Sequence, residues 1–224
     1  MQVLFVGNSY TYYHQLPSLF QTLSESGGYS VETAMAAEGG WTLAQHRDAA
    51  ETRALIGTRP WQYVVLQEQS LSPALPERLG QLTRPAAQAL ANQIRQQGAQ
   101  PLLFMTWGYR DGSPKAGLGN YRTMQAQLER GYRTLAQELA APLVPVGLAW
   151  QRALDTVPQL PLWDEDGSHP SLAGSYLAAC VLYGVIHRSS PEGLAYTAGL
   201  SLVTGEALQR AAAQAVVAET AIAH

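Results

Sequence analysis

The sequence predicts an α/β protein, a three-layer α/β/α sandwich in which helices cover both faces of a five-stranded parallel sheet. Five short apolar runs recur along the 224 residues, with helix-like segments between them. This alternation implies right-handed crossovers and parallel strands. Hydrophobic residues make up 46% of the chain and charged residues 14%, which is ample material for a core. We expect one domain over residues 1–224.

The five expected strands are runs of the kind found in strands buried on both faces. They span residues 3–6, 31–35, 63–66, 102–105 and 143–146. The first run stops at Gly7-Asn8-Ser9, and these small polar residues predict a sharp exit from the sheet. Ligands of open α/β sheets bind outside the carboxyl ends of the strands, so Ser9 is expected at the ligand-binding edge.

The helix-like segments alternate with these strands. Between the strands we expect helices over residues 16–26, 44–56, 85–97 and 121–139. In the last of these, Leu128, Tyr132, Leu135 and Leu139 form one apolar stripe at spacings of four and three. After the fifth strand we expect a loop as far as Pro170. Helices over residues 171–187 and from about residue 204 then complete the chain.

Composition limits the partners that the protein can have. The net charge is −3, and the 14 basic residues form no run, which argues against a nucleic-acid or membrane surface. Cys180, the single cysteine, lies in an apolar segment and is expected to be a buried thiol. The sequence as given has no signal peptide and no 18-residue apolar run. It predicts a cytoplasmic protein, or a secreted one if a leader was removed, and it does not indicate an oligomeric state.

Three residues from the two ends of the chain form a candidate catalytic set. In "DEDGSHPS", Asp166 precedes His169 by three residues, so that one loop can present both side chains. A serine nucleophile needs a base that takes its proton and a carboxylate that orients the base. Ser9, His169 and Asp166 could supply these groups. The alternative is that Asp166-Gly167 forms only a turn before a capped helix.

Two motifs resemble a known family. "GNSYT" after the first strand and "DGSH" near the end resemble the first and last sequence blocks of the SGNH (GDSL-like) hydrolases, a family of serine esterases, acetylesterases and lipases. "VVLQEQS" and "GSHPSLAGSYLAA" are similar to a bacterial branch of that family. The resemblance implies a flavodoxin-like fold and an esterase without cofactor or metal. Ser9 would be its nucleophile, His169 its base and Asp166 the orienting carboxylate.

The resemblance also implies an oxyanion hole. Gly40 in "EGGWT" matches the family's second block and would donate its main-chain N–H together with that of Ser9. The third block departs from the family's "GxND", because "YVVLQEQS" has neither Gly nor Asn. A side-chain amide can replace the missing Asn, and we expect Gln69 in that role, with Gln67 as second choice. Glu68 between them is expected to serve structure.

Aromatic residues on the predicted loops suggest a wall for a flat, polar ligand such as a sugar. We expect Tyr10, Trp41, Trp107 and Trp163 to contact substrate, while Tyr12, Tyr13 and Tyr109 lie on the same loops. Alternatively, these rings simply cover the end of the sheet. Arg110 either contacts a polar substrate or pairs with Asp111. His14, His46 and His187 have no carboxylate at a useful spacing and are expected to be structural or exposed.

The expected function is hydrolysis of a small acyl ester, an acetyl ester of a carbohydrate or another polar small molecule. One alternative is a ligand-binding module on the same fold with weak or no catalysis, which the departure from "GxND" suggests. Another is a metal site at Asp164, Asp166 and His169. It lacks both the distant bidentate Glu of a calcium loop and a second histidine cluster.

Overall fold

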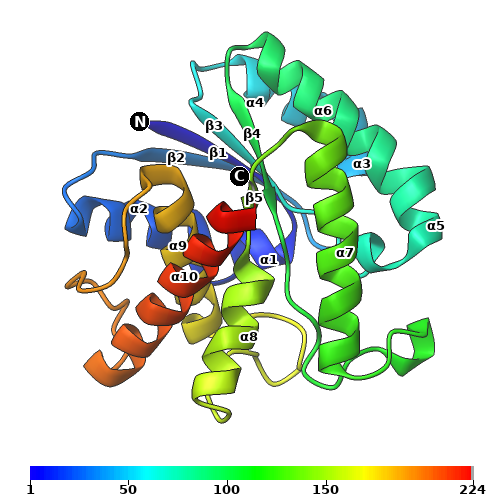
Figure 1. The fold of residues 1–224 in the computed structure, drawn as a ribbon. Helices are drawn as coiled ribbons and strands as arrows, with labels where there is room; N and C mark the ends of the chain where they lie inside the picture. The colour runs from blue at the N-terminus through cyan, green and yellow to red at the C-terminus, as the bar shows by residue number, and fades with distance from the viewer. Residues whose placement is uncertain (223–224) are drawn as a thin grey trace.

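The computed structural model describes residues 1–222 and contains one five-stranded sheet (Figure 1). Its strands are β1 (Gln2–Gly7), β2 (Glu32–Ala37), β3 (Tyr63–Leu66), β4 (Gln100–Phe104) and β5 (Leu143–Val144). All neighbouring strands are parallel, in the order β2-β1-β3-β4-β5, which confirms the predicted parallel sheet. The chain order reverses between β1 and β3. The carboxyl ends of these two strands therefore frame the crevice where such sheets bind ligands.

Helices cover both faces of the sheet, as Figure 1 shows, and the predicted three-layer sandwich is confirmed. One layer contains α2 (Leu16–Ser26), α8 (Val146–Thr156), α9 (Leu172–His187) and α10 (Leu202–Ile222). The other contains α3 (Leu43–Asp48), α4 (Ala50–Gly57), α6 (Arg84–Gln96) and α7 (Tyr121–Leu139). The short elements are α1 (Ser9–Tyr12), η1 (Tyr13–Gln15), η2 (Ser72–Ala74), α5 (Pro76–Arg78), η3 (Leu79–Thr83) and η4 (Pro114–Ala116).

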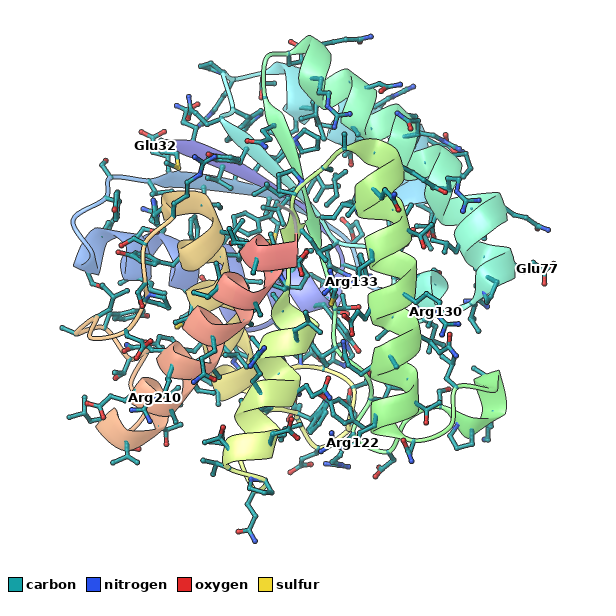
Figure 2. The ribbon with its side chains drawn as sticks, viewed as in Figure 1. Glu32, Glu77, Arg122, Arg130, Arg133 and Arg210 are labelled. Carbon is teal, nitrogen blue, oxygen red and sulfur yellow. The ribbon has the colours of Figure 1, made fainter. Side chains whose placement is uncertain are left out.

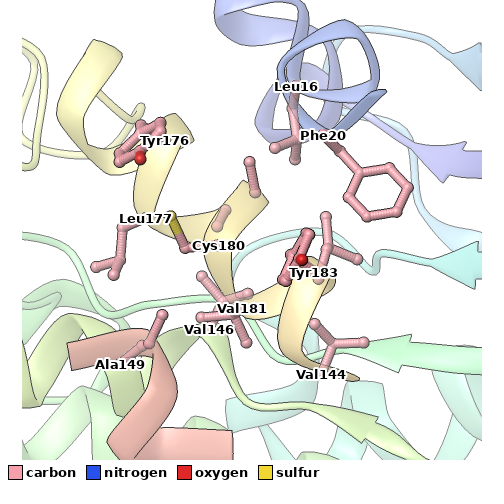
Figure 3. Close-up of a cluster of buried hydrophobic side chains, with 14 of the residues drawn as sticks. Leu16, Phe20, Val144, Val146, Ala149, Tyr176, Leu177, Cys180, Val181 and Tyr183 are labelled. Carbon is pink, nitrogen blue, oxygen red and sulfur yellow. The ribbon is translucent and has the colours of Figure 1, made fainter. Parts of the chain in front are cut away.

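Alternate residues of the central strands enter two separate cores. On β1, Val3 and Phe5 pack under α2 and α9, whereas Leu4 and Val6 pack against the opposite layer. Figure 3 shows the first core, where side chains of α2, α8 and α9 converge. Cys180 lies inside this core, and burial raises the pKa of its thiol to about 12. The prediction of a buried thiol is confirmed.

One expected helix is divided in the structure, and one observed helix was not expected. The expected helix over 44–56 is split into α3 and α4, because Ala49 is extended (φ −74°, ψ 122°). The helix α8 occupies chain that we expected to be loop. Pro145 ends β5 after two residues, and α8 begins directly behind it. Val146, Ala149, Trp150 and Ala153 in fact carry the helical spacing that predicts this helix.

Charged side chains lie mainly on the surface of the protein. Figure 2 shows Glu77 and Arg210 projecting outward from α5 and α10. Arg122 and Asp155 form an ion pair between α7 and α8, with 2.6 Å between nitrogen and oxygen, and both side chains are largely exposed. Such pairs contribute little stability. Across residues 1–222, no helix combines the length and the apolar character needed to cross a bilayer.

Candidate active site

Ser9, His169 and Asp166 meet at the carboxyl edge of the sheet. His169 Nε2 lies 2.9 Å from Ser9 Oγ, and His169 Nδ1 lies 2.5 Å from Asp166 Oδ2. A carboxylate accepts a hydrogen bond from the Nδ1–H group and so keeps the proton on Nδ1, which leaves the lone pair of Nε2 to accept a hydrogen bond from the serine hydroxyl. The structure thus brings together the three residues expected to be catalytic, although Ser9 and His169 are 160 positions apart in the chain.

A tight turn places Ser9 at the end of β1. A Cβ on Gly7 would lie 2.3 Å from Thr11 Oγ1 and 2.5 Å from Gln67 Oε1, so only glycine fits. Asn8 then caps α1, because its Oδ1 accepts the N–H of Tyr10 at 3.1 Å. Ser9 is the first residue of this helix. Its N–H makes no hydrogen bond within residues 1–222 and remains available to a ligand.

The loop before α9 places the carboxylate of Asp166. Asp166 Oδ1 accepts the main-chain N–H groups of Ser168 (2.8 Å) and His169 (2.9 Å), which leaves Oδ2 for the imidazole. Partial burial works to raise the pKa of Asp166, but the hydrogen bonds from His169 and the two main-chain N–H groups outweigh it. The pKa therefore lies below its usual value. Asp166 is consequently ionised wherever a histidine base is active.

Two tyrosines from the segment after β1 surround the imidazole of His169. The ring of Tyr13 stacks face to face on it, with 4.3 Å between centroids and 13° between planes. The ring of Tyr10 meets it edge-on at 5.6 Å. The sequence predicts Tyr13 at this edge as one of the aromatic residues of a ligand wall, but it does not predict the contact with His169. The signal was its spacing of four from Ser9, about one helical turn.

The two expected main-chain donors of the oxyanion hole lie on neighbouring loops. Gly40 follows β2, has a left-handed φ of +72° and is exposed. Among the described residues, no hydrogen bond engages its N–H. Ser9 follows β1, which pairs directly with β2. The geometry is compatible with both donors, whose role stays a prediction.

The side chain of Gln69 forms hydrogen bonds within the turn that follows β3. Its Oε1 accepts the N–H of Leu71 at 3.0 Å and the hydroxyl of Ser72 at 3.2 Å, while Nε2 donates one hydrogen to Ser70 Oγ at 3.1 Å. The amide group is therefore held rigidly, and its Nε2 keeps a second hydrogen. The role of Gln69 as the third oxyanion donor stays a prediction.

Comparison with known proteins identifies the family. No family model matches the chain, and no curated protein matches it in sequence. Among solved structures, a putative SGNH hydrolase from Slackia heliotrinireducens is 30% identical, with a TM-score of 0.69 over 83% of this chain and 98% of that one. This chain belongs to the SGNH hydrolase family.

Two further solved structures share the fold of this SGNH hydrolase. A DUF4886 family protein from Bacteroides uniformis has a TM-score of 0.82 at 19% identity, over 97% of this chain and 95% of that one. An acetyl-xylooligosaccharide esterase variant from Geobacillus has a TM-score of 0.59 at 16% identity, over 81% of this chain and 92% of that one.

Gln67, the second choice for the oxyanion donor, instead supports the turn that carries Ser9 in this SGNH hydrolase. It is 1% exposed, and its Oε1 accepts from Asn8 N at 2.8 Å and Thr11 Oγ1 at 2.9 Å. Its Nε2 donates to the Glu68 carbonyl at 2.6 Å. The second choice is therefore corrected: the amide of Gln67 is buried, and its oxygen and its nitrogen are both hydrogen-bonded to other groups of the protein.

Glu68 serves structure, as expected. Its buried Oε1 accepts the N–H of Leu43 at 3.1 Å and that of Gln69 at 2.6 Å. The carboxyl group thereby joins the loop after β3 to the start of α3. Burial raises the pKa of Glu68, because water no longer stabilises the charged form.

His46 on α3 also holds the turn at the end of β1. The side chain is 1% exposed, and its Nε2 donates to the carbonyl of Gly7 at 2.7 Å. Its Nδ1 then accepts from Thr52 Oγ1 at 2.9 Å. Burial lowers the pKa of this imidazole below its usual value. The expectation that His46 is structural agrees with these contacts.

The lowered pKa of His46 predicts a loss of stability in acid. A histidine in an unfolded chain titrates near pH 6.5. Below that pH the unfolded chain therefore binds a proton at His46 that the buried imidazole of the folded protein does not bind. We therefore expect the free energy of unfolding to fall as the pH is lowered from 7.5 to 5.5. His46→Gln keeps a donor toward Gly7 and should reduce that loss, as urea unfolding at both pH values will measure. An equal loss in both proteins would refute the assignment.

Tyr10 and Trp107 are part of the core, which corrects the expectation that they contact substrate. Tyr10 is 3% exposed and Trp107 is fully buried. Trp107 stacks between Tyr10 (4.6 Å between centroids) and Trp150 (4.1 Å). The hydroxyl of Tyr10 lies 2.7 Å from Ser168 Oγ, and Trp107 Nε1 donates to the carbonyl of Ser168 at 3.0 Å. Through Ser168, these two buried rings anchor the loop that carries His169 to the core.

Trp163 and Arg110 also contact the protein itself. The half-buried Trp163 donates from Nε1 to the carbonyl of Gly108 at 3.0 Å. The guanidinium of Arg110 donates to the carbonyl of Glu165 at 3.2 Å and lies 3.7 Å from the carboxylate of Asp111. The alternative expected for Arg110, a pair with Asp111, is therefore the observed one. Trp41 is half-buried on the Gly40 loop, and its contact with substrate stays a prediction.

Asp164, the third ligand of the alternative metal site, has a local partner. Its Oδ1 accepts the N–H of Glu165 at 2.8 Å. Within residues 1–222, no three His, Cys, Asp or Glu side chains gather in a way that could hold a metal ion. The observed contacts of Asp166 and His169 favour the hydrolase interpretation of this loop.

Proposed function

We propose that the protein is a serine esterase that removes a small acyl group, acetyl in the first instance, from a carbohydrate or another polar small molecule. The observation that carries this proposal is the chain of two hydrogen bonds from Ser9 Oγ through His169 to Asp166. In this chain Ser9 has the place of a nucleophile, His169 that of a general base and Asp166 that of a carboxylate that orients the base.

In the proposed mechanism, Ser9 Oγ attacks the carbonyl carbon of the ester while its proton passes to His169 Nε2. Asp166 stabilises the resulting imidazolium. The N–H groups of Ser9 and Gly40 stabilise the negative oxygen of the tetrahedral intermediate. The intermediate collapses, Nε2 returns the proton to the leaving alcohol, and the acyl group stays on Ser9. Water, deprotonated by Nε2, then attacks the acyl carbon; the bond to Ser9 Oγ breaks, the acid leaves, and Nε2 returns the proton to Oγ.

The proposal of an acetylated carbohydrate rests on two supports. A protein of the same fold acts as an acetyl-xylooligosaccharide esterase. The loop that carries Gly40 also carries the half-buried Trp41, whose main-chain carbonyl accepts from Asn8 Nδ2 at 2.9 Å and whose ring meets that of His46 edge-on at 5.0 Å. An aromatic face at such a place suits the apolar face of a sugar ring.

Two series of substrates test the acyl group and the alcohol separately. Among p-nitrophenyl esters, we expect kcat/KM to be highest for acetate and to fall with longer acyl chains. We also expect acetylated xylooligosaccharides to release acetate faster than an acetylated aliphatic alcohol. A preference for long acyl chains would contradict the proposed acyl group, and equal rates on both alcohols would contradict the carbohydrate. Binding without turnover would favour the ligand-binding module.

The role of Gln69 can be measured by kinetics. One oxyanion donor is worth on the order of 3 kcal/mol, so Gln69→Ala should lower kcat about 100-fold. KM should change little, because the donor acts on charge that exists mainly in the transition state. Ser72→Ala removes a neighbouring contact of the same turn and serves as control. If both variants lose activity equally, Gln69 acts only through the turn.

A further inference from the structure

The segment that follows the nucleophile helix turns back and is tied to the histidine loop. Tyr13 is the C-cap of α1, and the next two residues, His14 and Gln15, have left-handed φ angles of +49° and +52°. Non-glycine residues adopt this conformation only where the surrounding structure enforces it, and such strain clusters at functional sites. The kink thus points to a specific requirement for the position of Tyr13.

Two hydrogen bonds hold this segment against the region around His169. His14 Nε2 donates to the carbonyl of Pro170 at 3.1 Å. The carbonyl of Tyr13 accepts from Ser175 Oγ on α9 at 3.5 Å. The carbonyl of Tyr13 and the side chain of its neighbour His14 are thus both held, and the ring of Tyr13 covers one face of the imidazole at 4.3 Å between centroids.

We infer that Tyr13 is a positioning residue that fixes the plane of the His169 ring and stabilises its protonated form. This inference rests on the proposed function, since the imidazolium forms when His169 takes the proton of Ser9. The face of an aromatic ring carries partial negative charge and attracts a cation placed over it. Tyr13 therefore favours the charged state that His169 reaches in the transition state.

Asp166, Tyr10 and Tyr13 contact the imidazole of His169 directly. Asp166 contacts Nδ1, and Tyr10 meets the ring edge-on. Of the other titratable groups nearby, Asp164 and Tyr12 lie close enough to influence Tyr13, Arg110 donates to the carbonyl of Glu165, and His14 donates to that of Pro170. A variant that changes only the electron density of the Tyr13 ring leaves every other group in place, so it isolates the effect of the stacked face.

A fluorination series provides that variant in the full-length chain. Phenylalanine, 4-fluoro-, 3,5-difluoro- and 3,4,5-trifluorophenylalanine at position 13 keep the shape of the ring and weaken the charge on its face stepwise. NMR titration of the His169 ring carbon protons in each protein needs no enzymatic activity. The midpoint should fall stepwise, by about 0.4 to 0.7 pH unit over the series. A midpoint constant within 0.1 unit over the series would overturn the inference.

A pair of simple substitutions extends the test to catalysis. Tyr13→Leu removes the stacked face and should lower kcat about 3- to 10-fold on an aryl acetate, with the acid limb of the pH profile displaced to lower pH. Tyr29→Leu removes a tyrosine that stacks on a different histidine, His187, at 4.0 Å between centroids, and should change neither. Equal effects of both variants would contradict the role of Tyr13. If wild-type protein hydrolyses no ester while the fluorination series still shifts the midpoint, the proposed function fails and the stacking effect stands.

Discussion

Ser9→Ala is expected to abolish hydrolysis of an activated acetyl ester, with kcat reduced about 10⁴-fold or more. In the proposed mechanism the hydroxyl attacks the ester, and no other hydroxyl contacts His169 Nε2 in the structure of residues 1–222. The fold should remain intact, because the change removes one hydrogen bond worth about 1 kcal/mol. The rate of p-nitrophenyl acetate hydrolysis and a thermal melt of the same sample measure both effects.

Ser168→Ala is a matched control for this substitution. Ser168 Oγ lies 2.7 Å from the hydroxyl of Tyr10, next to His169 in the chain, but it does not contact the imidazole nitrogens. The control should keep activity within about an order of magnitude of wild type. A Ser9→Ala protein that is folded and retains most of its turnover would exclude Ser9 as nucleophile.

Asp166→Asn should lower kcat about 10³-fold, the second-largest effect that we expect. A carboxylate at this position selects the histidine tautomer with the proton on Nδ1 and stabilises the imidazolium, whereas an amide does neither reliably. Asp166 is half-exposed, and water offsets part of the lost charge, so we expect less than the full effect of a buried carboxylate. The effect should appear in kcat, with little change in KM.

Asp164→Asn is the internal control, because it makes the same chemical change two residues away. Asp164 Oδ1 accepts the N–H of Glu165, which an asparagine oxygen can also do. Its turnover should stay within about twofold of wild type. If the order of the two variants is reversed, Asp164 orients the base in solution and the contact of Asp166 with His169 is not the productive one.

The sheet and most helices could be predicted because apolar residues form continuous runs in the strands and recur at helical spacing in the helices. Residues 63–66, 16–26 and 121–139 were expected with the same bounds as β3, α2 and α7. The helix α8 was missed, although Val146, Ala149, Trp150 and Ala153 carry its period. A strand was expected to run to residue 146, but Pro145 ends it, so the helical pattern begins inside residues that were assigned to the sheet.

The candidate triad could be predicted because spacing and residue type define it. The direction of loop side chains could not. Tyr10 in α1 and Trp107 after β4 lie at the ligand-binding edge, yet both rings turn inward: Tyr10 stacks on Trp107, and Trp107 stacks on Trp150. Gln67 and Glu68 are both buried because β3 ends at Leu66, so the alternation of a strand no longer separates them. Such choices depend on packing between segments distant in sequence.

The measurement that tests the central claim most directly is covalent labelling of the wild-type chain with a fluorophosphonate, followed by peptide mapping. An activated serine attacks the phosphorus and expels fluoride, and the adduct stays on the oxygen that attacked. We expect one adduct per chain, located on Ser9, and none in Ser9→Ala. His169→Ala, which lacks the base, should label far more slowly. Wild-type protein that is folded and takes up no label, or takes it up at another serine, would contradict the account.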